Sequence, residues 1–336
     1  MKKLMVILVV LFSTFLSACA HDNDLDLTVY TSETYYMDTV IDMQVYAANE
    51  SEAKAACKAA EQEYARIEQI SDRFDKKSEL YQVNQAQGEA VQVSDDLWQM
   101  VTQALEMGKK SGGSFSIAIG AVMDLWDFNG KKHLPSEAEL QKILPSINDK
   151  NIIIDENNRT ITVKNDTVID LGAVAKGYAT DCAVAALKEA GIKHAVINAG
   201  GNVYALGSMP DGKPWRIGIR NPRPEDGREL VGIIEVINKS VVTSGDDQRF
   251  FEVDGKRYHH ILNPQTGMPA DESVFATVIC ENSAMADMLS TAVFVLGPND
   301  YKKILTQGEE AWTVIMDEDG KMTASPGMNE YLIIVD

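Results

Sequence analysis

The chain has 336 residues, of which 45% are hydrophobic, and its 50 acidic side chains outnumber 31 Lys and Arg to give a net charge of −19. This length is sufficient for a large core, in one big domain or in two tightly joined lobes. Such an acidic surface repels the phosphate backbone of nucleic acids, and we therefore expect no nucleic-acid binding. A smaller ligand that carries phosphate would need a locally positive site or a bound cation.

Residues 1–18 have the pattern of a lipoprotein signal peptide. Two lysines near the start precede an apolar run, Leu4 to Leu16, that is too short to span a bilayer comfortably. The run leads into Leu-Ser-Ala-Cys, which resembles a bacterial lipobox, in which Cys19 would carry the lipid. The alternative is a plain secretory signal with a chance cysteine. We therefore expect a tether over 19–30, a main domain over 31–336, and a protein lipid-anchored to the cell membrane, facing the periplasm or the cell exterior.

Helix and strand patterns follow one another in irregular order along the rest of the chain. Helices are predicted over 51–70, 95–110, 173–190 and 283–296, and a short one opens at Ser136 with a capping box. Strands are predicted over 39–46, 152–155, 160–164, 167–171, 195–198, 215–220, 230–237, 241–244, 250–253, 274–280 and 331–335. Because strands and helices do not alternate strictly, the sequence predicts an α+β fold rather than a doubly wound sheet.

The stretch D-L-G-A-V-A-K-G-Y-A-T-D, residues 170–181, lies where a predicted strand becomes a helix. A helix N-terminus offers unpaired N–H groups and the positive end of the helix dipole, so Lys176 and the glycines beside it suit a phosphate site. The Lys-Ser/Thr ending of the Walker A motif and the GxGxxG spacing of dinucleotide-binding folds are both absent. An ordinary strand-to-helix turn with a surface lysine therefore explains the same residues equally well.

The predicted helix over 283–296 is apolar nearly all round, and Asp287 and Thr291 are its exceptions. Their spacing of four residues places both oxygens on one face of the helix, and oxygen ligands without Cys or His suit a hard cation such as Mg²⁺. The structural alternative is an Asp supported by the helix dipole and a Thr bonded back to its own turn.

Two adjacent histidines precede a turn in Y-H-H-I-L-N-P-Q-T-G-M-P-A, residues 258–270. In an extended chain His259 and His260 point to opposite faces, so only one can reach a given site. A histidine beside a turn suits a general base, although such residues are also often structural.

Taken in order, these motifs resemble those of the ApbE family. The resemblance starts near Tyr35 and is carried by D-L-G-x-x-A-K-G-Y, H-I-x-x-P-x-T-G-x-P and A-D-x-L-S-T-A, together with Y-Y-M-D-T, S-D-R-F-D, A-V-M-D-L-W-D-F and T-S-G-D-D-Q-R-F-F. It implies a T-fold-like architecture and a Mg²⁺-dependent enzyme that transfers FMN from FAD to a threonine of an acceptor flavoprotein through a phosphoester bond, releasing AMP. The implied acceptor is a membrane or extracellular electron-transfer subunit.

The resemblance also implies roles for single residues. Asp287, Thr291 and the backbone carbonyl of Ala173 would hold the metal, and His260 would be the base. The implied FAD contacts are Met37, Phe74, Ala121, Val122, Met123, Asp170, Lys176 and Ile261. Two departures stand out, since the family often has Gly where this chain has Asp38 and Tyr where it has Asp247.

Two other functions share the same motifs. A metal-dependent FAD pyrophosphatase would use water in place of threonine and would release FMN and AMP. A lipid-anchored flavin-binding protein would need no base at all, and His260 beside Lys176 and Asp287 favours chemistry over storage.

Overall fold

The structure is a computed structural model that describes residues 26–224, 227–305 and 310–335. The predicted signal peptide and Cys19 lie outside these residues. Strand β1 (Thr28–Tyr36) begins inside the segment expected to be a tether, so residues 28–30 belong to the sheet. Within the described ranges, no helix combines the length and the apolar character needed to cross a membrane.

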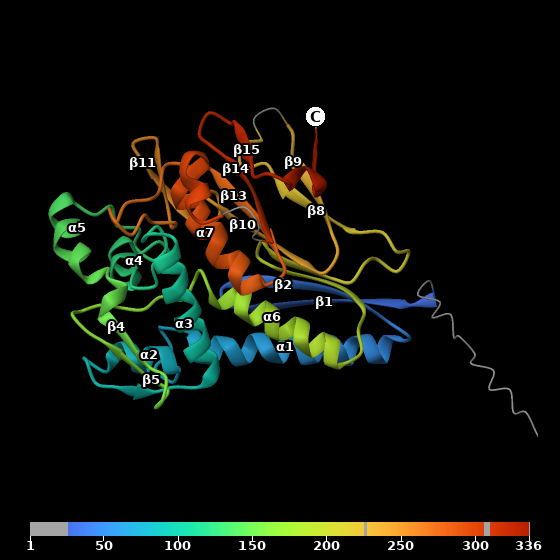
Figure 1. The fold of residues 1–336 in the computed structure, drawn as a ribbon, viewed down its shortest axis with the longest axis horizontal. Helices are drawn as coiled ribbons and strands as arrows, with labels where there is room; N and C mark the ends of the chain where they lie inside the picture. The colour runs from blue at the N-terminus through green and yellow to red at the C-terminus, as the bar shows by residue number, and fades with distance from the viewer. Residues whose placement is uncertain (1–25, 225–226, 306–309, 336) are drawn as a thin grey trace, which may run out of the picture.

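An eight-stranded sheet with the order β1-β2-β6-β7-β10-β13-β14-β15 forms the centre of the molecule (Figure 1). All neighbouring strands in it are antiparallel. After β1 its strands are β2 (Thr39–Ala47), β6 (His194–Ala199), β7 (Asn202–Leu206), β10 (Lys239–Gly245), β13 (Phe275–Cys280), β14 (Ala311–Met316) and β15 (Met322–Ala324).

Helices cover one face of this sheet. The long helices are α1 (Glu50–Ser71), α3 (Asp95–Lys110), α6 (Ala175–Glu189) and α7 (Ser283–Asp300). Helix α6 packs between α1 and α7, and α7 lies on β10, β13 and β14 (Figure 1). The other face carries a three-stranded sheet, β16-β9-β8 (Leu332–Ile334, Leu230–Val236 and Trp215–Arg220).

Strand β13 supplies side chains to both faces of the large sheet. Phe275 and Ile279 join the core beneath the three-stranded sheet. Ala276 and Val278 join the core beneath the helices. A strand covered on both faces is expected to be continuously apolar, and every residue of β13 is buried.

A smaller unit with its own aromatic core, which contains Trp126, Phe128 and Phe251, lies beside the helices. Its elements are α4 (Gly120–Trp126), α5 (Glu137–Ile143) and the hairpin β11–β12 (Phe250–Val253 and Lys256–His259). Helix α2 (Glu79–Gln85) and the sheet β3-β5-β4 (Val91–Gln92, Thr160–Val163 and Ile152–Asp155) instead bury their apolar side chains in the core beneath the long helices. Short 3₁₀ helices lie at Leu144–Ser146, Asp149–Asn151, Tyr301–Lys303 and Met328–Glu330.

The α+β prediction is confirmed, and the four long helices form close to their expected bounds. The capping box at Ser136 is present, with its side chain and that of Glu139 each bonded to the other's backbone N–H. The strand predicted over 167–171 is wrong. Asn84 bonds both backbone groups of Ile169 through its side chain, and the flanking backbone bonds go to Ile117 and Gly120, so this segment is extended without joining a ladder.

Candidate active site

One cavity of about 1340 Å³ brings most of the predicted site residues together. Its volume exceeds the ~300–1000 Å³ of an ordinary small-molecule pocket, so it can hold a large ligand. The walls come from the β1–β2 turn, the end of α1, α4, the start of α6, the ends of β8 and β10, the segment after β12, and α7. The predicted residues that line it are Met37, Phe74, Met123, Asp170, Ala173, Lys176, His260, Ile261, Asp287 and Thr291.

Two predicted contacts, Ala121 and Val122, do not line the cavity. Both precede Met123 in helix α4, but successive helical residues point in different directions. Val122 is fully buried in the aromatic core of the small unit. The helix instead presents Met123 and Asp124 to the cavity, together with the residues that cap its ends, Ile119 and Asp127.

The predicted metal ligands lie where α6 meets α7. Asp287 is only 5% exposed, and the backbone N–H of Gly177 donates to its Oδ2 at 3.0 Å. The hydroxyl of Thr291 lies 3.3 Å from the Asp287 carbonyl and 3.4 Å from Oγ of Ser244. Thr291 therefore makes the bond to its own turn that the structural alternative requires, and both Thr291 and Ala173 line the cavity.

This oxygen set fits Mg²⁺ better than a metal held by several side chains. No group of three or more His, Cys, Asp and Glu side chains in the described part of the chain could hold a metal. Mg²⁺ commonly takes one or two protein carboxylates and completes its shell with water and substrate phosphates. Asp287, Thr291 and the Ala173 carbonyl would supply that kind of partial shell.

The turn before α6 is fixed by an arginine that sequence reasoning missed. Asp170 accepts the Gly172 N–H at 2.8 Å through Oδ1, and its Oδ2 lies 2.7 Å from Nε of Arg73. Arg73 also bonds Asp124 at 2.7 Å, and its guanidinium stacks 4.2 Å from the ring centroid of Phe74. Burial lowers the pKa of Arg73, but the two carboxylates outweigh burial and raise it, so Arg73 remains charged. The sequence signal that could have identified Arg73 is its position directly before Phe74 in the motif S-D-R-F-D.

Phe74 is 69% exposed although it lines the cavity, so a flat aromatic face is presented to a ligand. Lys176 also lines the cavity, and its ammonium group donates a hydrogen bond to the Gly172 carbonyl at 3.1 Å. Together they offer an aromatic surface and a cation, which suit the ring and the phosphates of a flavin nucleotide.

His259 is the last residue of β12 and His260 follows it in a bend, and the two rings have different surroundings. His259 is buried, with Nε2 2.8 Å from the Ala270 carbonyl and its ring edge-on to Phe294, so its position is structural. The backbone N–H of His260 donates to the Arg249 carbonyl at 3.0 Å, and its ring lines the cavity. Burial, reinforced by Arg249 and other nearby cationic groups, lowers the pKa of His260 to about 3, so its imidazole is neutral near pH 7.

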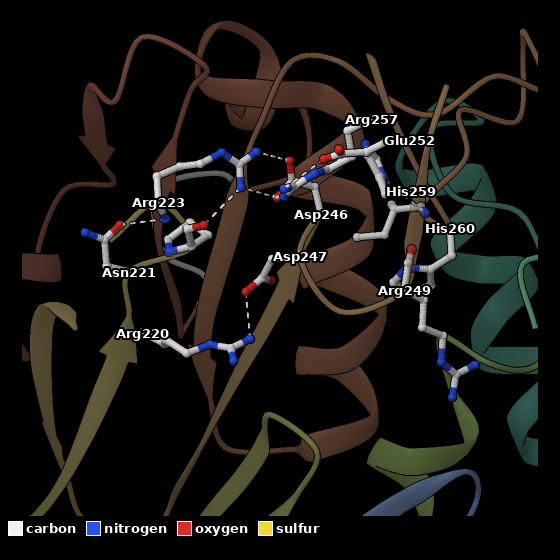
Figure 2. A network of polar contacts seen from close by, with 12 residues as sticks. Arg220, Asn221, Arg223, Asp246, Asp247, Arg249, Glu252, Arg257, His259 and His260 are labelled. Atoms are coloured by element: carbon white, nitrogen blue, oxygen red, sulfur yellow. Dashed lines mark hydrogen bonds and ion pairs between the residues drawn. The ribbon is translucent and has the colours of Figure 1, made fainter. Parts of the chain in front are cut away.

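The two departures from the family motifs have structural explanations. Met37 and Asp38 form the β1–β2 turn with φ of 54° and 57°, a left-handed conformation that glycine adopts freely and that Asp tolerates. Asp38 therefore keeps the turn that a glycine would make. Asp247 forms an ion pair with Arg220 at 2.6 Å on the cavity wall (Figure 2).

Comparisons with known proteins place these motifs in one family. The ApbE family model matches residues 37–316. An FAD:protein FMN transferase of Klebsiella pneumoniae is 32% identical over 296 residues, covering 85% of this chain and 88% of that protein. One from Rhodobacter capsulatus is 31% identical over 91% of this chain, which spans 59% of that longer protein. The crystal structure of the ApbE protein of Thermotoga maritima superposes with a TM-score of 0.84 at 31% identity, over 90% of this chain and 99% of that one. The chain therefore belongs to the ApbE family.

Proposed function

We propose that this protein transfers FMN from FAD to a threonine side chain of an acceptor flavoprotein, with Mg²⁺ as the cofactor and AMP as the second product. The relatives named FAD:protein FMN transferase support flavin transfer from FAD. The observation that carries the proposal is that Asp287, Lys176 and His260 line the same cavity.

In the proposed reaction the threonine oxygen attacks the phosphorus on the FMN side of the pyrophosphate. The new bond joins the threonine oxygen to that phosphorus, and the bond to the bridging oxygen breaks, so AMP leaves with the bonding electron pair. The threonine proton passes to the neutral imidazole of His260, which is deprotonated at neutral pH because its pKa is low.

Positive charge near the phosphates matters because the protein as a whole is strongly acidic. Asp287, Thr291 and the Ala173 carbonyl would hold Mg²⁺, which neutralises phosphate charge when bound. Lys176 adds a side-chain cation at the start of α6. Arg249 lines the same cavity, and its nearest carboxylate contact is Asp38 at 4.0 Å, so its guanidinium can also face a phosphate.

Mass spectrometry tests the proposal directly. The protein is incubated with FAD, Mg²⁺ and an electron-transfer flavoprotein, or a peptide from one, that carries a candidate threonine. Transfer predicts an FMN-sized adduct on that threonine together with stoichiometric AMP. Free FMN plus AMP without adduct would instead establish the pyrophosphatase, and unchanged FAD would establish a binding protein, so either result refutes the proposal.

We also propose that Cys19 carries a lipid and that the domain works at the membrane, facing the periplasm or the cell exterior. The support is the lipobox-like Leu-Ser-Ala-Cys at the end of the apolar run. Two acyl chains hold a protein on a bilayer stably, whereas a single chain does so only reversibly. Metabolic labelling with a clickable fatty acid tests the modification, and absence of label from Cys19 would refute it.

A further inference from the structure

A buried aspartate next to the cavity joins the β8–β9 loop to the β11–β12 hairpin, which leads directly into the proposed base. The side chain of Asp246 is 9% exposed and belongs to the segment after β10. Arg223, from the β8–β9 loop, bonds both of its carboxylate oxygens, with Nη1 3.0 Å from Oδ1. Arg257, from β12, places Nη1 3.7 Å from the same Oδ1 (Figure 2).

Both arginines are themselves held in place. The backbone N–H of Arg223 donates to the Asn221 side chain at 2.9 Å, and its Nη1 donates to the Pro222 carbonyl at 3.1 Å. The guanidinium of Arg257 lies 4.0 Å from the ring centroid of Phe250, the first residue of β11. A bidentate arginine fixes orientation as well as charge, so the Asp246 carboxylate fixes these two loops relative to β10.

The segment that contains Asp246 also contacts both the proposed metal site and the proposed base. At Ser244, two residues before Asp246, the hydroxyl lies 2.8 Å from that of Ser290 and 3.4 Å from that of Thr291 on α7. At Arg249, three residues after Asp246, the backbone carbonyl accepts the N–H of His260. Asp246 therefore lies between the contact with the metal site and the contact with the base.

We propose that Asp246 is a positioning residue that, through Arg223 and Arg257, holds the β11–β12 hairpin so that His260 keeps its place relative to Thr291. The inference rests on the proposed function, because it takes His260 to be the base in FMN transfer. Asp246 itself is outside the residues that line the cavity, so it acts through the histidine rather than on the substrate.

The substitution Asp246→Asn tests this because it keeps the shape of the side chain and removes its charge. The kcat of transfer should fall about 10- to 100-fold, the range expected when a catalytic group is misplaced by about an ångström. The FAD Kd and the KM for the acceptor should stay near the wild-type values, since the cavity wall is kept. Asp246→Glu, which restores the charge, should recover part of the lost rate.

Asp96→Asn is the matched control. Asp96 forms an ion pair with Arg66 and accepts a hydrogen bond from Tyr178 at 2.9 Å, but it does not line the cavity. It should cost comparable stability in thermal unfolding and leave kcat close to the wild-type value. If Asp246→Asn fails to fold, Arg223→Lys carries the same test, because it keeps the charge and removes the planar fork that bonds both Asp246 oxygens.

A double-mutant cycle with His260→Ala separates positioning from general destabilisation. If Asp246 acts through His260, Asp246→Asn should reduce kcat little further once the imidazole is gone. Additive losses in the two backgrounds, a loss confined to KM, or an unchanged kcat in Asp246→Asn would each overturn the inference. A wild-type protein without transfer activity would instead overturn the proposed function, and the inference with it.

Discussion

Replacing Gly177 with alanine should disturb the packing of two helices and the metal site together. Gly177 lies in the first turn of α6, where α6 crosses the start of α7. A Cβ at this position would lie 2.3 Å from the Ser283 carbonyl oxygen and 2.7 Å from Cα of Ala284. Both are backbone atoms and cannot rotate away, and ordinary contact begins near 3.4 Å. The helices must therefore separate by about 1 Å in an interior that is otherwise close-packed.

Two opposing effects decide the change in the free energy of unfolding. Alanine is favoured over glycine inside a helix by about 1 kcal/mol. Overpacking a well-filled contact costs about 1–3 kcal/mol, and the rigid backbone partners of Gly177 place the cost toward the upper end. We expect a net loss of about 1–2 kcal/mol. With an m-value of about 3 kcal/mol/M in urea, the midpoint should fall by about 0.3–0.7 M.

The same substitution should weaken metal binding, because separating the two helices moves the backbone N–H of residue 177, which alanine keeps, away from the Asp287 carboxylate that it bonds. Losing a partner that orients a ligand typically costs about 10- to 100-fold in metal affinity, so the Mg²⁺ concentration for half-maximal transfer should rise by that factor. Urea unfolding and a Mg²⁺ titration of transfer measure the two effects. The control is Ala185→Gly on the exposed side of α6, which should cost about 1 kcal/mol through propensity and leave the Mg²⁺ response unchanged. A Gly177→Ala protein that is more stable than wild type and has an unaltered Mg²⁺ requirement would refute the reasoning.

Four further predictions concern residues singled out from the sequence. His260→Ala should spare FAD binding and slow transfer by about 10²–10⁴-fold, whereas His259→Ala should mainly lower the unfolding temperature; the reverse pattern of kinetics would show that the base is assigned wrongly. Burial lowers the pKa of His260 to about 3, so the stability contributed by its neutral ring is present above the unfolded pKa of about 6.5 and is lost as the pH falls toward 3. Measuring the free energy of unfolding against pH for the wild type and for His260→Gln tests this, because only the wild type should show this loss. Chelation by EDTA should abolish transfer and Mg²⁺ should restore it. Asp287→Ala should remain inactive at high Mg²⁺ while Thr291→Ala is partly rescued, and full activity of either the metal-free protein or Asp287→Ala would contradict the metal site. Cys19→Ser should leave an active domain that no longer fractionates with membranes once the signal is removed, and activity that stays in the membrane fraction would count against the lipobox.

The parts of the site that could be predicted are those that local sequence determines. Helix 283–296 is mostly apolar and places Asp287 and Thr291 four residues apart, so this pair of polar groups on a buried helix was visible without any tertiary information. The alternation of an extended chain likewise separated His259 from His260. In both cases the periodicity of one element fixes which side chains share a face.

The parts that could not be predicted depend on contacts between distant segments. The segment 167–171 opens with a β-branched run and has strand propensity, but its backbone bonds go to the Asn84 side chain, to Ile117 and to Gly120 at the start of α4, all far away in the sequence. Strand β1 was missed because it is an edge strand with weak burial, so it has little hydrophobic alternation. The contacts of Asp246 with Arg223 and Arg257 join three separate segments, and no spacing rule brings such residues together.

The placement of β13 between two cores has a consequence for how the molecule opens. Alternate residues of this strand belong to the helical side and to the side of the small sheet, so neither layer can detach without exposing apolar surface of the same strand. Local openings that free β13 therefore approach global unfolding in their energy. Its amide protons should be among the last to exchange with deuterium, and a ligand held on α7, which packs directly on β13, should slow the exchange of strands on both sides of the sheet.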